Sequence, residues 1–202
     1  MKTEEFLRIM DTAEKLKNHT RHSWTSSGRH ESVAEHSWRL ALMAYFVRDE
    51  YPDLDMGRVI LMCLFHDMGE AFTGDIPAFE KTGEHERAEA EAVEDWLSGL
   101  PSFYREELGA LFSEMEERQT PEARLYKALD KLEALIQHNE ADISTWLPLE
   151  HELQMTYGVL EAGWSRYTRR LRERVRKDSQ EKLKRDDGGE EALNGKTDFF
   201  GK

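Results

Sequence analysis

The sequence LMCLFHDMGEAFTGDIP, residues 61–77, joins a buried-helix pattern to a cluster of ionisable groups. Its opening residues are apolar, but His66 and Asp67 follow directly, and Glu70 and Asp75 come soon after. Ionised side chains cost several kcal/mol to bury without a partner. We therefore expect this helix end either to reach water or to hold a positive charge among its carboxylates.

Length and composition indicate one globular domain. The chain has 202 residues, of which 39% are hydrophobic and 34% charged, enough for one core under a charge-rich surface. It has no apolar run of about 18 residues that would span a membrane, and its N-terminal segment MKTEEFLRIM lacks the apolar core of a signal peptide. The single cysteine excludes an internal disulfide framework, so we expect a cytoplasmic protein. A net charge of −13 argues against binding long nucleic acids but permits a small anionic substrate.

Apolar residues recur with helical spacing throughout the chain, and no convincing strand or repeat is found. The expected helices cover residues 6–16, 33–50, 56–69, 84–97, 102–112, 121–136 and 149–175. Ser32 and Glu35 form a capping box, and Thr120 is an N-cap followed by Pro121 at the first helical position. This pattern predicts an all-α domain over residues 1–177, with a polar, disordered tail over 178–202.

Three of the predicted helices each place metal-ligand residue types against an apolar stripe. His36 lies on the capped helix, His66 and Asp67 close the third helix, and Asp130 lies within the helix that begins at Pro121. Two imidazoles and two carboxylates suit a divalent ion such as Mn, Co, Fe, Ni, Zn or Mg. Such an ion would neutralise the carboxylates, and an octahedral ion would keep positions for water and substrate. The pattern therefore predicts a metal site where a helix end opens onto a cleft.

Each of these residues also has an ordinary structural interpretation. A lone histidine on an apolar helix face, such as His36, is more often a hydrogen-bonded core residue, and Asp130 could pair with Lys127 or Lys131. The four positions taken together favour a metal, because one helical frame supplies all of them. His85 is the only histidine between the two aspartates, which favours a single ion over a dinuclear site.

The motifs resemble those of the HD-domain metal-dependent phosphohydrolases, and more closely the bacterial 5′-deoxynucleotidases and their eukaryotic relatives. The family pattern H…HD…D is met by His36, His66, Asp67 and Asp130. More specific are the shared segments ESVAEHS at 31–37, HDMGE at 66–70 and TGDIP at 73–77. The resemblance covers roughly residues 5–165. It implies an HD-domain helical bundle, one divalent ion held by the four ligands, and a homodimer.

The resemblance also implies roles for individual residues. Glu70 falls on the family's catalytic glutamate, Asp75 on a substrate-contacting aspartate, and Arg21 on an arginine that orients phosphate, and these three form the predicted catalytic set. The predicted substrate-binding residues are Arg21, His22, His36, Asp75, Ile76 and Pro77. The sequence differs from the family pattern at the position directly after Arg21. The family has tryptophan there, whereas this chain has His22, with Trp24 two places later. This departure bears on sugar or base preference rather than on metal chemistry.

Charge indicates how such a site would act. The metal would acidify a bound water and polarise a phosphoryl oxygen. Glu70, about one helical turn from His66, could carry a proton, and Arg21 offers a planar fork to phosphate oxygens. Together with the resemblance to the 5′-deoxynucleotidases, this chemistry implies a phosphomonoesterase that converts a (deoxy)nucleoside 5′-monophosphate to nucleoside and phosphate. Two alternatives stay open: another HD-type hydrolase, acting on an alarmone or phosphodiester, and a non-catalytic, metal-stabilised module that binds a nucleotide.

Overall fold

The structure is a computed structural model that describes the backbone of residues 1–197 and the side chains of residues 1–186. Helices dominate it, which confirms the predicted all-α class. The α-helices are α1 Thr3–Lys15, α2 Val33–Phe46, α3 Met56–Phe65, α4 Glu70–Thr73, α5 Gly83–Ser98, α6 Ser102–Glu117, α7 Pro121–Glu140, α8 Pro148–Thr156, α9 Val159–Ala162 and α10 Arg166–Thr197. The remaining elements are strands β1 Thr20–Trp24 and β2 His30–Ser32 and the 3-10 turns η1 Arg48–Glu50 and η2 Ile143–Thr145.

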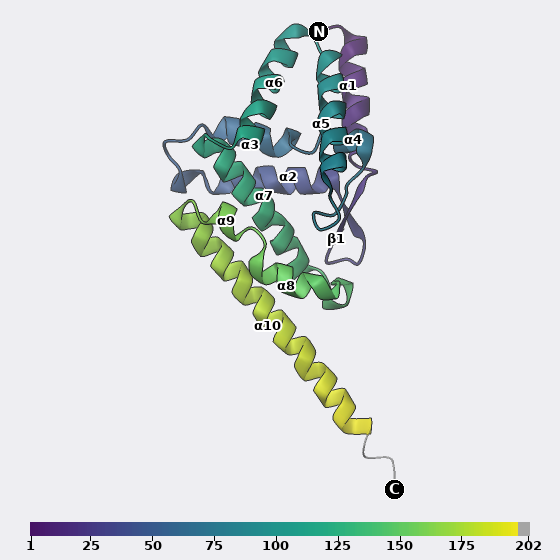
Figure 1. The fold of residues 1–202 in the computed structure, drawn as a ribbon, viewed down its shortest axis with the longest axis vertical. Coiled ribbons are helices and arrows are strands. Elements are labelled where there is room, and N and C mark those ends of the chain that lie inside the picture. The colour runs from purple at the N-terminus through teal and green to yellow at the C-terminus, as the bar shows by residue number, and fades with distance from the viewer. Residues whose placement is uncertain (198–202) are drawn as a thin grey trace.

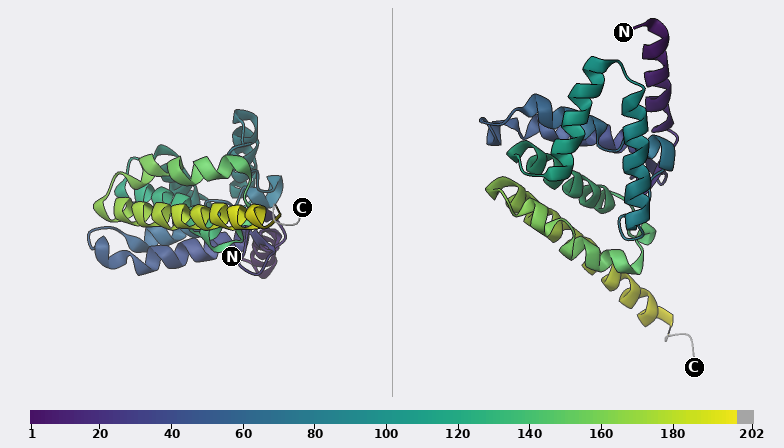
Figure 2. Two further views of the ribbon diagram at one scale, coloured as in Figure 1. Left: turned by 90° about the horizontal axis from the view of Figure 1, so that it is seen from below. Right: turned by 45° about the horizontal axis from the view of Figure 1, so that its top comes forward.

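Helix α7 runs through the middle of the molecule (Figure 1). It packs against α2 and α3 and also against α9 and α10. Helices α1 and α5 stand side by side at the end that carries the N-terminus, and α10 extends well beyond the other helices (Figures 1 and 2). Within the described residues, no helix combines the length and the apolar character needed to cross a membrane.

The main core lies where α2, α3, α6 and α7 face one another. Its fully buried side chains include Leu40, Met62, Leu111, Leu125 and Leu129. The apolar run that precedes His66 therefore belongs to a core helix, α3. Because α3 ends at Phe65, the ionisable residues that follow it lie at the edge of this core.

Capping residues set where α2 and α7, the helices that carry His36 and Asp130, begin. Ser32 Oγ accepts a hydrogen bond from the Glu35 amide at 3.2 Å, and the Glu35 carboxylate accepts one from the Ser32 amide at 2.9 Å. At the start of α7, the Thr120 hydroxyl caps the first turn, and Pro121 occupies its first position. Both predicted helix starts are confirmed, and they fix which face of each helix turns inward.

The expectation that the chain contains no strand is wrong for residues 20–32. There β1 and β2 pair antiparallel, with Thr20 opposite Ser32. The turn between them contains Gly28 at φ 81°, a conformation that glycine adopts without strain. The strands have five and three residues and are mostly polar, so they carry no alternating apolar pattern to reveal them.

Three expected helices are interrupted, and the one predicted over 33–50 ends at Phe46, before the separate 3-10 turn η1. The helix predicted over 56–69 ends at Phe65, and the chain becomes helical again only at Glu70, in the short α4. The helix predicted over 149–175 is divided into α8, α9 and α10, with Gly158 at φ 70° before α9. The His66 amide still donates to the Met62 carbonyl at 3.0 Å, so the regular helix is left directly after His66, at the place where the site forms.

The predicted boundary between domain and disordered tail at residue 177 is wrong, because α10 continues to Thr197. Ser179 is fully buried, and its hydroxyl donates to Asn139 Oδ1 at 2.8 Å. Lys182 Nζ donates to the Asn139 carbonyl at 3.1 Å. The sequence did not predict this packing, because small and charged side chains hold this part of α10 by hydrogen bonds and no apolar stripe marks it. Residues 198–202 of the predicted tail lie outside the described residues.

Candidate active site

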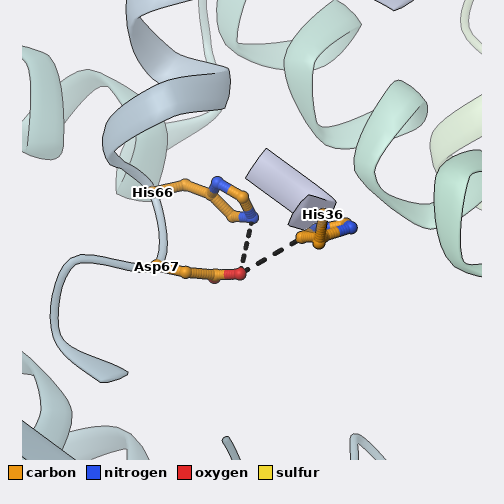
Figure 3. A group of neighbouring side chains, drawn as sticks. All are labelled: His36, His66 and Asp67. Atoms are coloured by element: carbon orange, nitrogen blue, oxygen red, sulfur yellow. Dashed lines mark ion pairs between the residues drawn. The ribbon is translucent and has the colours of Figure 1, made fainter. Parts of the chain in front are cut away.

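Four side chains from three parts of the fold converge on one point. His36 comes from the first turn of α2, His66 and Asp67 directly follow α3, and Asp130 comes from α7. His66 Nε2 lies 3.0 Å from Asp67 Oδ2, and His36 Nε2 lies 3.3 Å from Asp130 Oδ1. The distances from His36 Nε2 to Asp67 Oδ2 and from His66 Nε2 to Asp130 Oδ1 are both 3.8 Å. Figure 3 shows both imidazoles beside the Asp67 carboxylate. The structure thus brings the four predicted ligands together.

The far side of each imidazole is held by an acceptor. His36 Nδ1 bonds to Glu133 Oε2 at 2.5 Å, and His66 Nδ1 bonds to the Cys63 carbonyl at 3.0 Å. An acceptor at Nδ1 fixes the tautomer and leaves the Nε2 lone pair available. Both Nε2 atoms are buried, and neither has a hydrogen-bond partner within residues 1–186. Such an orientation is typical of metal-binding histidines.

The two aspartates have the charge that a ligand requires. Burial raises the pKa of Asp67, but the imidazoles of His66 and His36 outweigh it and hold that pKa below its usual value. Burial also raises the pKa of Asp130, whereas Lys127 and His36 bring it well below its usual value. Two ionised carboxylates facing two unpartnered imidazole nitrogens fit a divalent cation.

Asp130 satisfies both interpretations that the sequence left open. Its Oδ2 pairs with Lys127 Nζ at 2.8 Å and lies 3.9 Å from Lys131 Nζ. Its Oδ1 instead faces the imidazoles of His36 and His66. The lysines therefore orient the carboxylate by one oxygen and leave the other directed at the centre of the four ligands.

Glu70 begins α4 and lies beside the ligands. It is 5% exposed, and its Oε2 has no hydrogen-bond partner in the described part of the chain. Carboxylate oxygens of Asp67, Glu70 and Glu89 lie within 4.8 Å of one another. Burial raises the pKa of Glu70 to about 10, and the charges of Asp67, Asp75 and Glu89 contribute to this rise. A cation at the neighbouring ligands would lower this pKa toward the range in which a carboxyl serves as acid or base.

Arg21, from β1, is connected to the ligand cluster through Glu133. Its Nη1 lies 3.4 Å from Glu133 Oε2, the same oxygen that bonds His36, and 3.4 Å from Glu31 Oε2. Burial lowers the pKa of Arg21, but Glu133 and Glu31 raise it by more, so the guanidinium stays charged. The buried Glu31 carboxyl has its pKa raised to about 7 by burial and by Glu133. This network holds a positive charge next to the predicted metal ligands.

Sequence reasoning assigned no role to Glu31, Glu133 or Glu89. Glu133 follows Asp130 by three positions, so the two carboxylates share one face of α7. A charged residue within the buried stripe of Leu129 and Leu132 is the signal that could have revealed it. Glu31 belongs to the segment at 31–37 that resembles the family, but its position is set by strand β2 of the hairpin, which the sequence did not predict. Glu89 lies on α5, a charged helix with no fully buried residue, and its sequence context gave no sign of a role.

A cavity of about 280 Å³ lies beside Arg21, between β1, the loop after α4, α7 and α8. Of the predicted substrate-binding residues, Arg21, His22, Asp75 and Pro77 line it. Burial raises the pKa of Asp75, and Arg21 opposes this rise. Two other predicted substrate-binding residues do not line this cavity. Ile76 is half-buried elsewhere, and His36 faces the carboxylates of Asp67 and Asp130. The geometry therefore places the charged guanidinium of Arg21 and a ligand-sized cavity next to each other.

Residues 13–172 match the HD-domain family. The chain belongs to this family. The match contains all four predicted ligands, and it confirms the resemblance and the HD-domain helical bundle that the sequence predicted. Membership implies a divalent metal, and the four converging side chains fit one.

Relatives from distant organisms are similar over most of the domain. A human protein named 5′-deoxynucleotidase HDDC2 is 34% identical over 152 residues, which cover 73% of this chain and 70% of the human one. A Schizosaccharomyces pombe protein named 5′-deoxynucleotidase hdd1 is 31% identical over 163 residues, covering 72% of this chain and 81% of that one.

Solved structures agree with the fold. A predicted metal-dependent phosphohydrolase from Magnetospirillum magnetotacticum superposes with a TM-score of 0.74 at 29% identity, covering 90% of this chain and 93% of that one. A conserved hypothetical protein from Pyrococcus furiosus superposes with a TM-score of 0.64 at 31% identity, covering 85% of this chain and 99% of that one. The bundle is therefore shared over most of the chain.

Proposed function

We propose that this protein hydrolyses (deoxy)nucleoside 5′-monophosphates to nucleoside and inorganic phosphate. The observation that carries the proposal is the position of Arg21, a buried and charged guanidinium between the ligand cluster and a small cavity. The names of the human and fission yeast relatives support the same reaction class. The cavity volume of about 280 Å³ suits a nucleoside rather than a polymer.

Different residues of the chain have different roles in this proposed reaction. Arg21 holds phosphate oxygens and offsets their charge, and Glu133 and Glu31 keep its guanidinium in place. Glu70 accepts a proton from the attacking water or returns one to the leaving oxygen. Asp75, at the cavity wall, binds a hydroxyl of the sugar.

We propose one divalent ion, held by the Nε2 atoms of His36 and His66 and by Asp67 and Asp130. When bound, it supplies Lewis-acid charge to a phosphoryl oxygen and acidifies water. The donor set of two imidazoles and two carboxylates is compatible with Mn, Co, Fe, Ni, Zn or Mg. Elemental analysis of purified protein tests the stoichiometry: one equivalent supports the proposal, and two equivalents contradict it.

The experiment that tests the reaction is a comparison of phosphate release from matched phosphoesters. We expect 5′-monophosphates of nucleosides or deoxynucleosides to be hydrolysed, and 3′-monophosphates and phosphodiesters to react far more slowly. Preferred cleavage of a diester or an alarmone would replace this proposal with another HD-type hydrolase. Binding of nucleotides without phosphate release, with any divalent ion, would favour a non-catalytic module.

We also propose that the protein is a cytoplasmic homodimer. The family resemblance supports the dimer, and the single cysteine, Cys63, agrees with a reducing compartment. Light scattering coupled to size-exclusion chromatography measures the mass directly. A monomer at micromolar concentration would contradict the proposed dimer.

A further inference from the structure

The cavity beside Arg21 carries a second polar cluster that the proposed phosphate chemistry does not use. It consists of His22 on β1, His138 on α7 and Glu150 on α8, and all three side chains line the cavity. His22 Nε2 lies 3.2 Å and His138 Nε2 3.4 Å from the same oxygen, Glu150 Oε1. Three separate elements thus place two imidazoles around one carboxylate at the cavity wall.

Glu150 is fixed in place by the helix that bears it. It is 4% exposed, and its Oε2 accepts a hydrogen bond from the Leu147 amide at 2.7 Å, at the start of α8. Its other oxygen is therefore directed at the two imidazoles. Because a carboxylate only accepts hydrogen bonds, it favours the proton on Nε2 of each ring and leaves Nδ1 of a neutral ring as an acceptor.

The cluster is incompletely satisfied by the protein. His22 Nε2 is buried and has no hydrogen bond of acceptable geometry within the described residues, although Glu150 is near. Burial lowers the pKa of His138, which keeps its ring neutral. A buried polar atom without a partner costs about 1–3 kcal/mol. The protein alone therefore does not fully satisfy the His22 ring, and a ligand in the cavity can bond to the Nδ1 acceptors that Glu150 leaves free.

The remaining walls suit a flat ring. Phe79 meets His22 edge to face with ring centroids 5.6 Å apart, and the rings of His22 and His138 are stacked with centroids 6.2 Å apart. Pro77, Leu135 and other apolar side chains complete the lining. Aromatic and apolar walls with a few polar groups favour a planar heterocycle whose edge carries donors and acceptors.

We propose that His22 and His138 bind the edge of the nucleobase, with Glu150 as the residue that positions both imidazoles. This inference rests on the proposed function, because Arg21 in the same cavity then holds the phosphate of the same ligand. If this is so, the three residues determine how much more tightly the protein binds a nucleotide than a sugar phosphate that lacks a base. The same arrangement also gives His22, which directly follows Arg21, a defined partner in α8.

The test compares ligands with and without a base in Glu150→Gln and His138→Phe. Calorimetry measures binding of deoxyadenosine and deoxycytidine, which lack phosphate, and kinetics give kcat/KM for dAMP and dCMP relative to deoxyribose 5-phosphate. Glutamine keeps the size of residue 150, and its amide oxygen can still accept the hydrogen bond from the Leu147 amide. The matched control is Glu152→Gln, the same substitution at an exposed position of the same helix.

We expect both variants to bind deoxynucleosides about tenfold more weakly and to lose about tenfold of the preference for nucleotide over deoxyribose 5-phosphate. The control should match the parent in both measurements. Unchanged nucleoside binding in both folded variants, or a parent that does not distinguish deoxyribose 5-phosphate from dAMP, would overturn the inference. Absence of phosphate release from every substrate would refute the proposed function instead, and nucleoside binding would still decide the role of the cluster.

Discussion

Substitution of Glu133 by glutamine tests how the ligand cluster is held together. Glu133 is fully buried, and its Oε2 bonds His36 Nδ1 at 2.5 Å and lies 3.4 Å from Arg21 Nη1. Its Oε1 lies 3.7 Å from Arg39 Nε. The substitution keeps the shape of the side chain but removes the charge that these three groups share.

The expected loss follows from these contacts. A hydrogen bond to a charged group contributes about 1.5–3 kcal/mol, and removing one partner of a buried ion pair costs about 3–5 kcal/mol. Arg21 keeps Glu31 at 3.4 Å, so the loss should lie near the lower end of that range. We therefore expect the free energy of unfolding of Glu133→Gln to fall by about 3 kcal/mol. Because His36 loses its orienting acceptor, metal affinity should also fall about 10–100-fold.

Urea unfolding of metal-free protein measures the first effect, and competition with a chelator measures the second. The matched control is Glu140→Gln on the same helix, where a half-exposed carboxylate pairs with Arg39 at 2.7 Å. That pair should contribute no more than about 1 kcal/mol and should not affect the metal. If Glu133→Gln lost stability but kept its metal affinity, Glu133 would be only a structural ion-pair partner, and its orienting role would be refuted.

Three other predictions concern separate parts of the molecule. Arg21→Ala should lower phosphate release without changing metal content, and equal turnover would remove Arg21 from the phosphate site. Glu70→Gln should keep metal and fold but lose about 10²–10⁴-fold in rate, and turnover equal to the parent would pass the proton-carrying role to another group. Truncation after Lys177 should lower the melting temperature, because it removes the buried Ser179 and its bond to Asn139; an unchanged melting curve would show that this part of α10 contributes nothing to stability.

The sequence predicted the ligand cluster because His36 and Asp130 lie on helices whose starts are set by local capping residues, and because His66 and Asp67 directly follow an apolar helix. Ser32 and Thr120 cap α2 and α7, and these caps fix which residues turn inward. The apolar stripes then identify His36 and Asp130 as polar residues on buried faces. Helical periodicity is a short-range signal, so it survives without knowledge of the fold.

The parts that the sequence did not predict depend on contacts between distant segments. The hairpin over 20–32 pairs short, polar strands, and it positions Arg21 and Glu31 within reach of Glu133 on α7. The second polar cluster joins Glu150 to histidines more than ten residues away in sequence. Such contacts arise from the packing of the bundle and leave no periodic trace in the sequence.

The central claim is that the four converging ligands bind a metal on which phosphate release depends. Its most direct test is phosphate release from dAMP by chelator-stripped protein, before and after addition of single divalent ions, in parallel with His66→Ala. We predict no release from the stripped parent, recovery with at least one ion, and neither metal binding nor recovery in His66→Ala. Full activity of the stripped parent, or of His66→Ala, would contradict the claim.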